Sequence, residues 1–209
     1  MAAEAVSSAP ERPPWWNQLP IALMSGGWLG PLVMFWLAVW GPMRPYDAAG
    51  PLSPSPVPYA LALPFCFAAA WVPGRWLRPR RWEMGGRLYE ALGVRAFRRL
   101  VPDGDWSNAL RRRRDPHYRV VPHRRAAQAF VARNDAGERS HGVLLLVGLV
   151  SSVYAWQIGW RGWAAFIGIG NVLVNLYPML LQRYTRARLF RLTARRSAGR
   201  RSEGFAAGG

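Results

Sequence analysis

Apolar and charged residues are separated along this chain into long blocks, and that separation limits what it can fold into. Ile21–Trp40 carries no charged residue, and a helix of this length spans about 30 Å, the thickness of a bilayer's hydrocarbon core. Further apolar blocks follow at Tyr59–Val72, Gly142–Trp160 and Trp163–Gln182. The pattern predicts an all-α integral membrane protein with about four transmembrane helices, the second of them weakened by Pro64.

The positive charge is concentrated on one predicted side of the membrane. All 28 basic residues are arginine, there are 11 acidic residues, and the formal net charge is +17. Residues 75–139 hold 17 arginines and residues 183–209 hold 8, whereas the two short loops hold only Arg44 and Arg161. By the positive-inside rule, the middle segment and both termini are expected in the cytoplasm. Arginines beside membrane-spanning blocks favour anionic membrane lipids over nucleic acid as partners.

These observations divide the chain into five segments. Arg161 and Gly162 are expected to form a tight turn between the last two helices, which must then pack antiparallel. The middle segment contains short amphipathic helices, one of them ended by Gly93, suited to lying on the membrane surface. The predicted segments are a Pro-rich lead (1–20), transmembrane helices 1 and 2 (21–74), an Arg-rich cytoplasmic segment (75–141), transmembrane helices 3 and 4 (142–189) and a basic disordered tail (190–209).

A first group of reactive side chains lies before the third apolar block. Glu138 and His141 are spaced i and i+3, so on a helix they share a face. A carboxylate beside an imidazole can fix its tautomer, as a general base that deprotonates an alcohol requires. Asp135 and Glu138 also fit a capping box that starts the third helix, and spacing alone favours this interpretation.

A second group lies on the fourth apolar block, where Asn171, Asn175 and Gln182 follow one helical stripe before an arginine-rich run. Amides within hydrocarbon are costly unless they are paired or face a polar cavity. They could therefore pack helices together or line a cleft that admits a head group, and the sequence favours neither. Asp103 lies between Pro102 and Gly104, a pattern more typical of a turn than of catalysis.

Other site types are poorly supported by this sequence. The single cysteine, Cys66, cannot form an internal disulfide or a thiolate cluster, and three histidines are too few for a membrane di-iron centre. Phosphate-binding loops and nucleophile elbows are lacking. We therefore expect no bound metal or cofactor, and no serine or cysteine nucleophile.

With these groups in place, the chain resembles the glycosyl-4,4'-diaponeurosporenoate acyltransferase family over roughly Trp82–Leu189. The resemblance depends on the tract Val94–Gly104, on Glu138-Arg139-Ser140-His141, and on Asn175 followed by Gln182–Leu189. The last of these, Gln-Arg-Tyr-Thr-Arg-Ala-Arg-Leu, is the most distinctive. The N-terminal half departs from the family pattern, because it is longer, Pro-rich and contains two apolar blocks without a match.

The resemblance implies a bacterial inner-membrane enzyme that transfers a fatty acyl group to a sugar hydroxyl of a glycosylated lipid or carotenoid. The acyl donor, acyl-CoA or acyl carrier protein, is then a co-substrate, and direct transfer is expected. His141 becomes the candidate base, Glu138 its orienting partner and Asp103 a second carboxylate. Arginines of the run would bind donor phosphates or acceptor groups. The implied substrate-binding set is Asn171, Asn175, Gln182, Arg183, Tyr184, Arg186 and Arg188.

An alternative is a small membrane scaffold without catalytic activity. Its arginines would hold anionic lipid or a partner enzyme, Glu138 would be only a cap, and the amides would only pack helices. The oligomeric state does not follow from either hypothesis.

Overall fold

The computed structural model describes residues 19–41, 53–101, 104–116 and 124–206, and all regular elements within these ranges are helical. The all-α prediction is therefore confirmed for the described residues. The helices are α1 (Leu19–Trp40), α2 (Val57–Cys66), the 3₁₀ helix η2 (Phe67–Trp71), α3 (Gly74–Leu77), the 3₁₀ helix η3 (Glu83–Gly85), α4 (Arg87–Ala91), α5 (Val94–Leu100), α6 (Asp105–Arg114), α7 (Arg124–Gln157), α8 (Arg161–Asn171), the π-helical η4 (Val172–Leu176) and α9 (Tyr177–Ala206).

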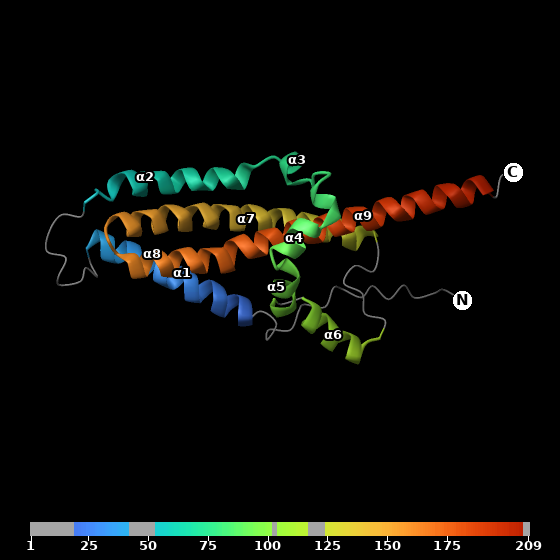
Figure 1. Ribbon diagram of the computed structural model, residues 1–209, viewed down its shortest axis with the longest axis horizontal. Coiled ribbons are helices and arrows are strands. Elements are labelled where there is room, and N and C mark those ends of the chain that lie inside the picture. Colours follow the sequence, from blue (N-terminus) through green and yellow to red (C-terminus); the bar gives the residue numbers. More distant parts are fainter. Residues whose placement is uncertain (1–18, 42–52, 102–103, 117–123, 207–209) are drawn as a thin grey trace, which may run out of the picture.

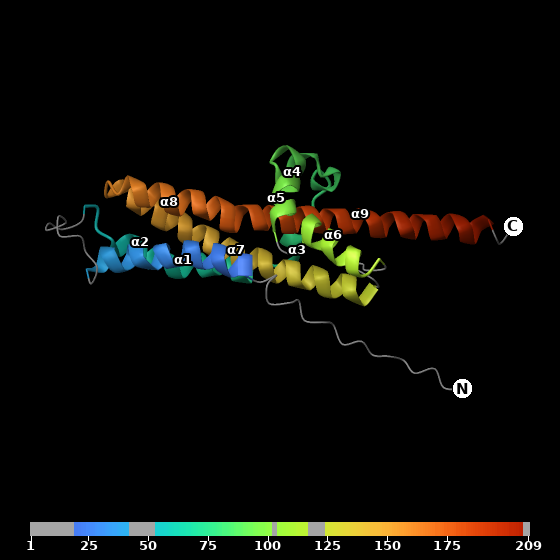
Figure 2. The same cartoon turned by 90° about the horizontal axis from the view of Figure 1, so that it is seen from below.

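Helices α1, α2 and α7 and the segment formed by α8 and α9 run side by side along the long axis of the molecule (Figure 1). Helix α7 lies at the centre of this bundle and contacts α2, α8 and α9, while α1 packs against α8. Helices α3–α6 gather at the opposite end from the α7–α8 turn, beside α9 (Figures 1 and 2). We call this end, built by residues 74–101 and 104–114 and the parts of α7 and α9 beside them, the polar end.

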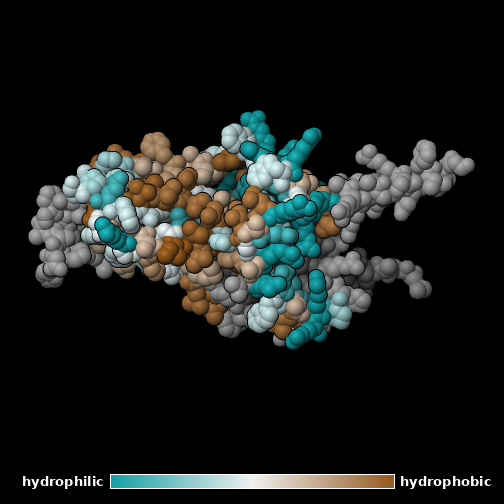
Figure 3. Space-filling model, viewed as in Figure 1, coloured by the Kyte–Doolittle hydropathy of each residue, from teal (hydrophilic) through white to brown (hydrophobic). Residues whose placement is uncertain are grey.

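Apolar side chains dominate the surface of the bundle away from the polar end (Figure 3). Within the described part of the chain, three helical stretches are long and apolar enough to cross a membrane: Ala22–Trp40, Gln128–Gln157 and Arg161–Leu192. Exposed side chains such as Leu23 and Phe65, 66% and 78% exposed, give this surface the character of a lipid-facing one. Three spans are thus supported by length and composition.

The second predicted span is shorter than the others. Val57–Trp71 combines ten α-helical and five 3₁₀ residues, which gives a length of about 25 Å. Pro64 lies inside α2, and its missing N–H removes one intrahelical hydrogen bond just before the change to 3₁₀ geometry. A fourth crossing therefore stays a prediction.

The start of the third helix differs from the sequence prediction. Helix α7 begins at Arg124 and continues for 34 residues, so Asp135 and Glu138 lie inside the helix and the predicted capping box is wrong. Helix formers such as alanine, arginine and glutamine fill its first turns, and residues on α9 pair with its acidic side chains. The predicted boundary between 75–141 and 142–189 consequently falls within one continuous helix.

Two further expectations are corrected or refined at the ends of the last helices. The turn between α7 and α8 uses Gly159, whose φ of +82° lies in the left-handed region, and α8 begins at Arg161. Helix α9 continues to Ala206 where a disordered tail was expected, because extending an existing helix avoids the cost of nucleation. Most of the predicted lead, 1–18, lies outside the described residues.

The buried apolar residues form two clusters. One fills the bundle and includes Trp28, Phe35, Tyr154 and Ile167; the Trp28 indole N–H donates to the Ile167 carbonyl at 3.1 Å. The other, Tyr89, Val94 and Tyr184, fastens α4 and α5 to α9 at the polar end. The predicted short helices are thus present, and their buried side chains Tyr89 and Val94 pack against α9.

Candidate functional site

His141 lies on α7 and is linked to the fourth apolar segment by a chain of polar side chains. Its Nδ1 atom is 3.3 Å from Asn175 Oδ1. Asn175 Nδ2 donates to Asn171 Oδ1 at 2.8 Å, and Asn171 Nδ2 donates to the backbone carbonyl of Leu145 at 2.9 Å. Both asparagines are buried, so the costly amides of this segment are paired with one another and with α7.

The carbonyl at the end of this chain sets the direction of every hydrogen bond in it. A carbonyl oxygen only accepts, so Asn171 must present its NH₂ group to Leu145 and its oxygen to Asn175. Asn175 then presents NH₂ to Asn171 and its oxygen to His141. A neutral His141 therefore carries its proton on Nδ1, and Nε2 is left as a proton acceptor.

The asparagines lie at a break in helix geometry. Residues Val172–Leu176 are π-helical, and Pro178 follows two positions later. Proline cannot donate to the carbonyl four residues earlier and its ring crowds that carbonyl, so a local change from α to π geometry is an expected response. π-Helical turns occur often at functional sites, and here the turn contains the residue that contacts His141.

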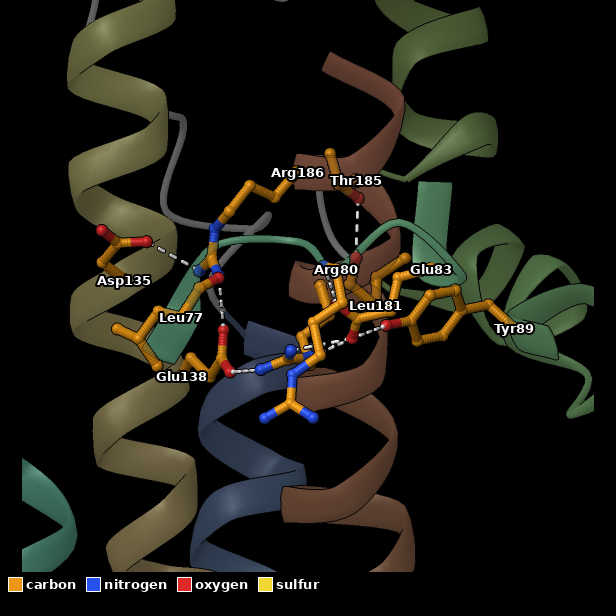
Figure 4. Close-up of polar contacts among 10 residues, drawn as sticks. Leu77, Arg80, Glu83, Tyr89, Asp135, Glu138, Leu181, Thr185 and Arg186 are labelled. Atoms are coloured by element: carbon orange, nitrogen blue, oxygen red, sulfur yellow. Dashed lines mark hydrogen bonds and ion pairs between the residues drawn. The ribbon is translucent and has the colours of Figure 1, made fainter. Parts of the chain in front are cut away.

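One helical turn from His141, a buried group of ion pairs joins α7, η3 and α9 (Figure 4). Arg183 donates to Glu83 Oε1 from Nε and Nη2, at 2.9 and 2.7 Å, and to Glu138 Oε1 from Nη1 at 2.6 Å. Glu83 and Glu138 are only 2% and 5% exposed. One guanidinium thus bridges two buried carboxylates.

Arg186 occupies the other side of Glu138. Its side chain is 2% exposed, and its guanidinium lies 2.8 Å from Glu138 Oε2 and 2.7 Å from Asp135 Oδ1. It also donates to the backbone carbonyl of Leu77. We call the set Glu83, Asp135, Glu138, Arg183 and Arg186 the ion cluster.

The predicted pairing of Glu138 with His141 is replaced by other contacts. Both carboxylate oxygens of Glu138 face arginines, and the partner of His141 is Asn175. The two side chains share a face of α7 but lie about one turn apart along its axis, so Glu138 meets arginines of α9 while His141 meets Asn175 in η4. Whether Glu138 affects catalysis stays a prediction.

Glu83 is a central residue that sequence reasoning missed. It accepts hydrogen bonds from the Tyr89 hydroxyl at 2.7 Å and from the backbone N–H of Arg80. Burial alone would raise the pKa of Glu83, but these hydrogen bonds and Arg183 hold that pKa below its usual value. Burial and the hydrogen bond with Glu83 raise the pKa of Tyr89 to about 12. A usable signal existed, since Glu83 is one of only two acidic residues among eight arginines in 75–100.

The remaining predicted residues fall into different surroundings. The amide of Gln182 lies against α7, where a Cβ added to Gly137 would be 2.4 Å from its Nε2. The Tyr184 hydroxyl donates to Glu90 at 3.2 Å, and Arg188 is exposed. Asp103 lies outside the described residues. The roles of these residues in substrate binding stay predictions.

The ion pairs of Arg183 and Arg186 affect the prediction that these arginines bind the acyl donor. Arg183 and Arg186 already contact carboxylates, so their guanidinium charge is compensated within the protein. Their function as phosphate ligands stays a prediction. Among the described residues, no group of three or more His, Cys, Asp or Glu side chains could hold a metal ion.

These features define a helical protein with three helices apolar enough to span a membrane and a polar site where the third and fourth apolar segments meet. The sequence model of one family, glycosyl-4,4'-diaponeurosporenoate acyltransferase, matches residues 73–195. The chain belongs to this family, and the predicted resemblance is confirmed. The matched region contains His141, both asparagines and the ion cluster. No curated protein and no solved structure matches the chain.

Proposed function

We propose that this protein is a membrane-bound acyltransferase that moves a fatty acyl group onto a sugar hydroxyl of a glycosylated lipid or carotenoid. Family membership supports the reaction class, and three long apolar helices support attachment to a membrane. We place it in the bacterial inner membrane with both termini in the cytoplasm, as the arginine distribution predicts.

The observation that carries the proposal is the hydrogen-bond chain from the Leu145 carbonyl through Asn171 and Asn175 to His141. It favours the tautomer of His141 whose Nε2 accepts a proton, which is the form a general base needs. Burial of both amides keeps the chain from exchanging its partners with water. Asn171 and Asn175 are then positioning residues.

The reaction balances with His141 as the only proton carrier. Nε2 removes the proton of the sugar hydroxyl as its oxygen attacks the carbonyl carbon of a thioester donor, acyl-CoA or an acyl carrier protein. The new C–O ester bond forms, the C–S bond breaks, and the imidazolium returns the proton to the leaving thiolate. His141 ends the cycle neutral, and no acyl-enzyme is required.

The test compares lipid extracts by mass from cells that express the parent chain, His141→Ala, or the control Ser140→Ala. Ser140 is exposed and adjacent on α7, and its hydroxyl donates within the helix to the Ala136 carbonyl at 3.1 Å. We expect His141→Ala to lose about 10²–10⁴-fold in transfer rate, the usual contribution of a general base. The Ser140→Ala rate should equal that of the parent.

Two further measurements separate catalysis from structure. Added imidazole should restore part of the activity of His141→Ala, since it can occupy the space of the missing ring. Asn175→Leu should lower kcat while leaving membrane insertion intact, because it removes the acceptor that holds the Nδ1 proton. Full transfer activity in His141→Ala membranes would refute the assignment of the base.

A further inference from the structure

An open recess of about 320 Å³ lies at the polar end, in the segment that joins η2 to η3. It is lined by Arg75, Trp76, Arg78 and Arg80. All four side chains are exposed, Trp76 to 62%. Three arginines and one tryptophan therefore line one small concave surface.

The charges of this recess are uncompensated within the described part of the chain. The acidic side chains nearest in sequence, Glu83 and Glu90, are held by Arg183 and by Tyr184 and Arg95 respectively. No carboxylate among the described residues contacts the guanidinium groups of Arg75, Arg78 or Arg80. Like charges this close repel one another, and a bound anion relieves that repulsion.

The backbone of this segment is fixed by the ion cluster. Arg186 holds the carbonyl of Leu77, and the carboxylate of Glu83 holds the N–H of Arg80. Both contacts are drawn in Figure 4. The arginines thus project from a backbone whose position is set by buried groups on α9 and η3, so part of the entropy cost of ordering a binding loop is already met.

A fourth arginine approaches the same segment from α7. Nη2 of Arg139 lies 3.9 Å from where a Cβ on Gly74 would be. Its Nε is buried and has no hydrogen-bond partner among the described residues. A buried donor without a partner is costly, and its place beside Gly74 provides one more cation for an anion bound there.

We propose that this recess binds phosphate esters, and that on the proposed function its ligand is the phosphate portion of the acyl donor. Arginine forks match phosphate oxygens in geometry and charge. The proposal moves the donor site from the paired Arg183 and Arg186 to the unpaired arginines of 75–80. The headgroup of an anionic phospholipid offers the same chemistry, and the experiment separates the two sources.

The test uses the full chain in uncharged detergent micelles, with coenzyme A as the first probe in equilibrium binding. Phosphatidylglycerol retained in native mass spectrometry, compared with phosphatidylcholine, is the second. The variant replaces Arg75, Arg78 and Arg80 with glutamine. The control replaces Arg81, Arg87 and Arg112, which are exposed and lie off the recess, so both variants lose the same net charge.

We expect the recess variant to bind at least one probe about tenfold more weakly, and the control to bind as the parent does. Selective loss of coenzyme A binding identifies the donor as the ligand. Selective loss of phosphatidylglycerol retention identifies a lipid headgroup and still supports the phosphate site. If neither probe is affected, or if the control loses binding equally, the proposal is overturned.

The outcomes for the recess and for the acyltransferase reaction are separable. Transfer in the recess variant should show a raised KM for the donor with kcat nearly unchanged, whereas His141→Ala loses kcat. Normal probe binding in the recess variant together with inactive His141→Ala removes only the recess proposal. Weak coenzyme A binding in the recess variant, with no acylated glycolipid from the parent, removes only the proposed reaction.

Discussion

Replacing Arg186 with methionine is the sharpest test of how the ion cluster holds the polar end together. Methionine has a similar length and no charge, so the change removes the compensation of Glu138 Oε2 and Asp135 and frees the Leu77 carbonyl. Arg188→Met is the matched control, since this arginine lies two positions away on the same helix and is exposed.

The expected loss in the free energy of unfolding of Arg186→Met follows from the burial of Arg186 and Glu138. Arg186 is 2% exposed and Glu138 is 5% exposed, and breaking a buried ion pair by removing one partner costs about 3–5 kcal/mol. Glu138 keeps Arg183 as a partner, so we expect the lower end of this range, a change of roughly a hundredfold in the unfolding equilibrium. Asp135 is 30% exposed in its side chain, so its pairing with Arg186 is screened by solvent and adds little.

The measurement is the apparent free energy of unfolding from SDS titration in mixed micelles. The double variant Arg186→Met with Glu138→Leu should be less destabilised than the sum of its single variants, because no carboxylate is then left at Glu138 with only one of its two arginines. Equal stability of Arg186→Met and Arg188→Met would refute the reasoning, since the buried contacts would then contribute nothing measurable.

Three further predictions concern other parts of the structure. Gly148→Ala should reduce transfer activity, because its Cβ would lie 2.6 Å from the Asn171 side chain. Gly142→Ala, whose Cβ would make an ordinary contact at 3.7 Å, is the control, and the rate of product formation is measured for both variants. The stability contributed by ionised Glu83 is fully present above its usual pKa of 4.5 and is lost as the pH falls through its lowered pKa. Tyr89→Phe removes one hydrogen bond to this carboxylate and should therefore move the midpoint of acid unfolding to higher pH. Protonated Tyr89 contributes stability below pH 10 that is lost as pH rises toward about 12, and an absorbance titration at high pH should show one late-titrating tyrosine that the Phe variant lacks.

The helical fold class was predictable from the sequence, because a helix that crosses the hydrocarbon core of a bilayer needs a long uncharged block. Such blocks are visible in the sequence without knowledge of tertiary contacts. The beginning of the third helix was not predictable in this way. Arg124–His141 is polar, and its helical state depends on α9, whose arginines pair with Asp135 and Glu138. A capping box and an ion pair across helices use the same residue types, and only the facing segment distinguishes them.

The sequence predicted several residues of the candidate site, but it did not predict which of them pair with one another. The stripe of Asn171 and Asn175 was evident from spacing, and its amides do pair. That His141 takes Asn175 as its partner depends on the depth at which α7 and η4 face each other, which no local pattern encodes. Glu83 was missed because its partner Arg183 lies 100 positions away in the chain.

The π-helical turn at Val172–Leu176 acts on the arginines that follow it. Such a turn behaves as one residue inserted into an α-helix, so it rotates everything after it by about 100° relative to an uninterrupted helix. Arg183 and Arg186 therefore face the glutamates of the polar end only while that turn is present. Shortening 172–176 by one residue would turn both guanidinium groups away from Glu138. A deletion within the apolar part of the bundle would therefore break the ion cluster at the polar end.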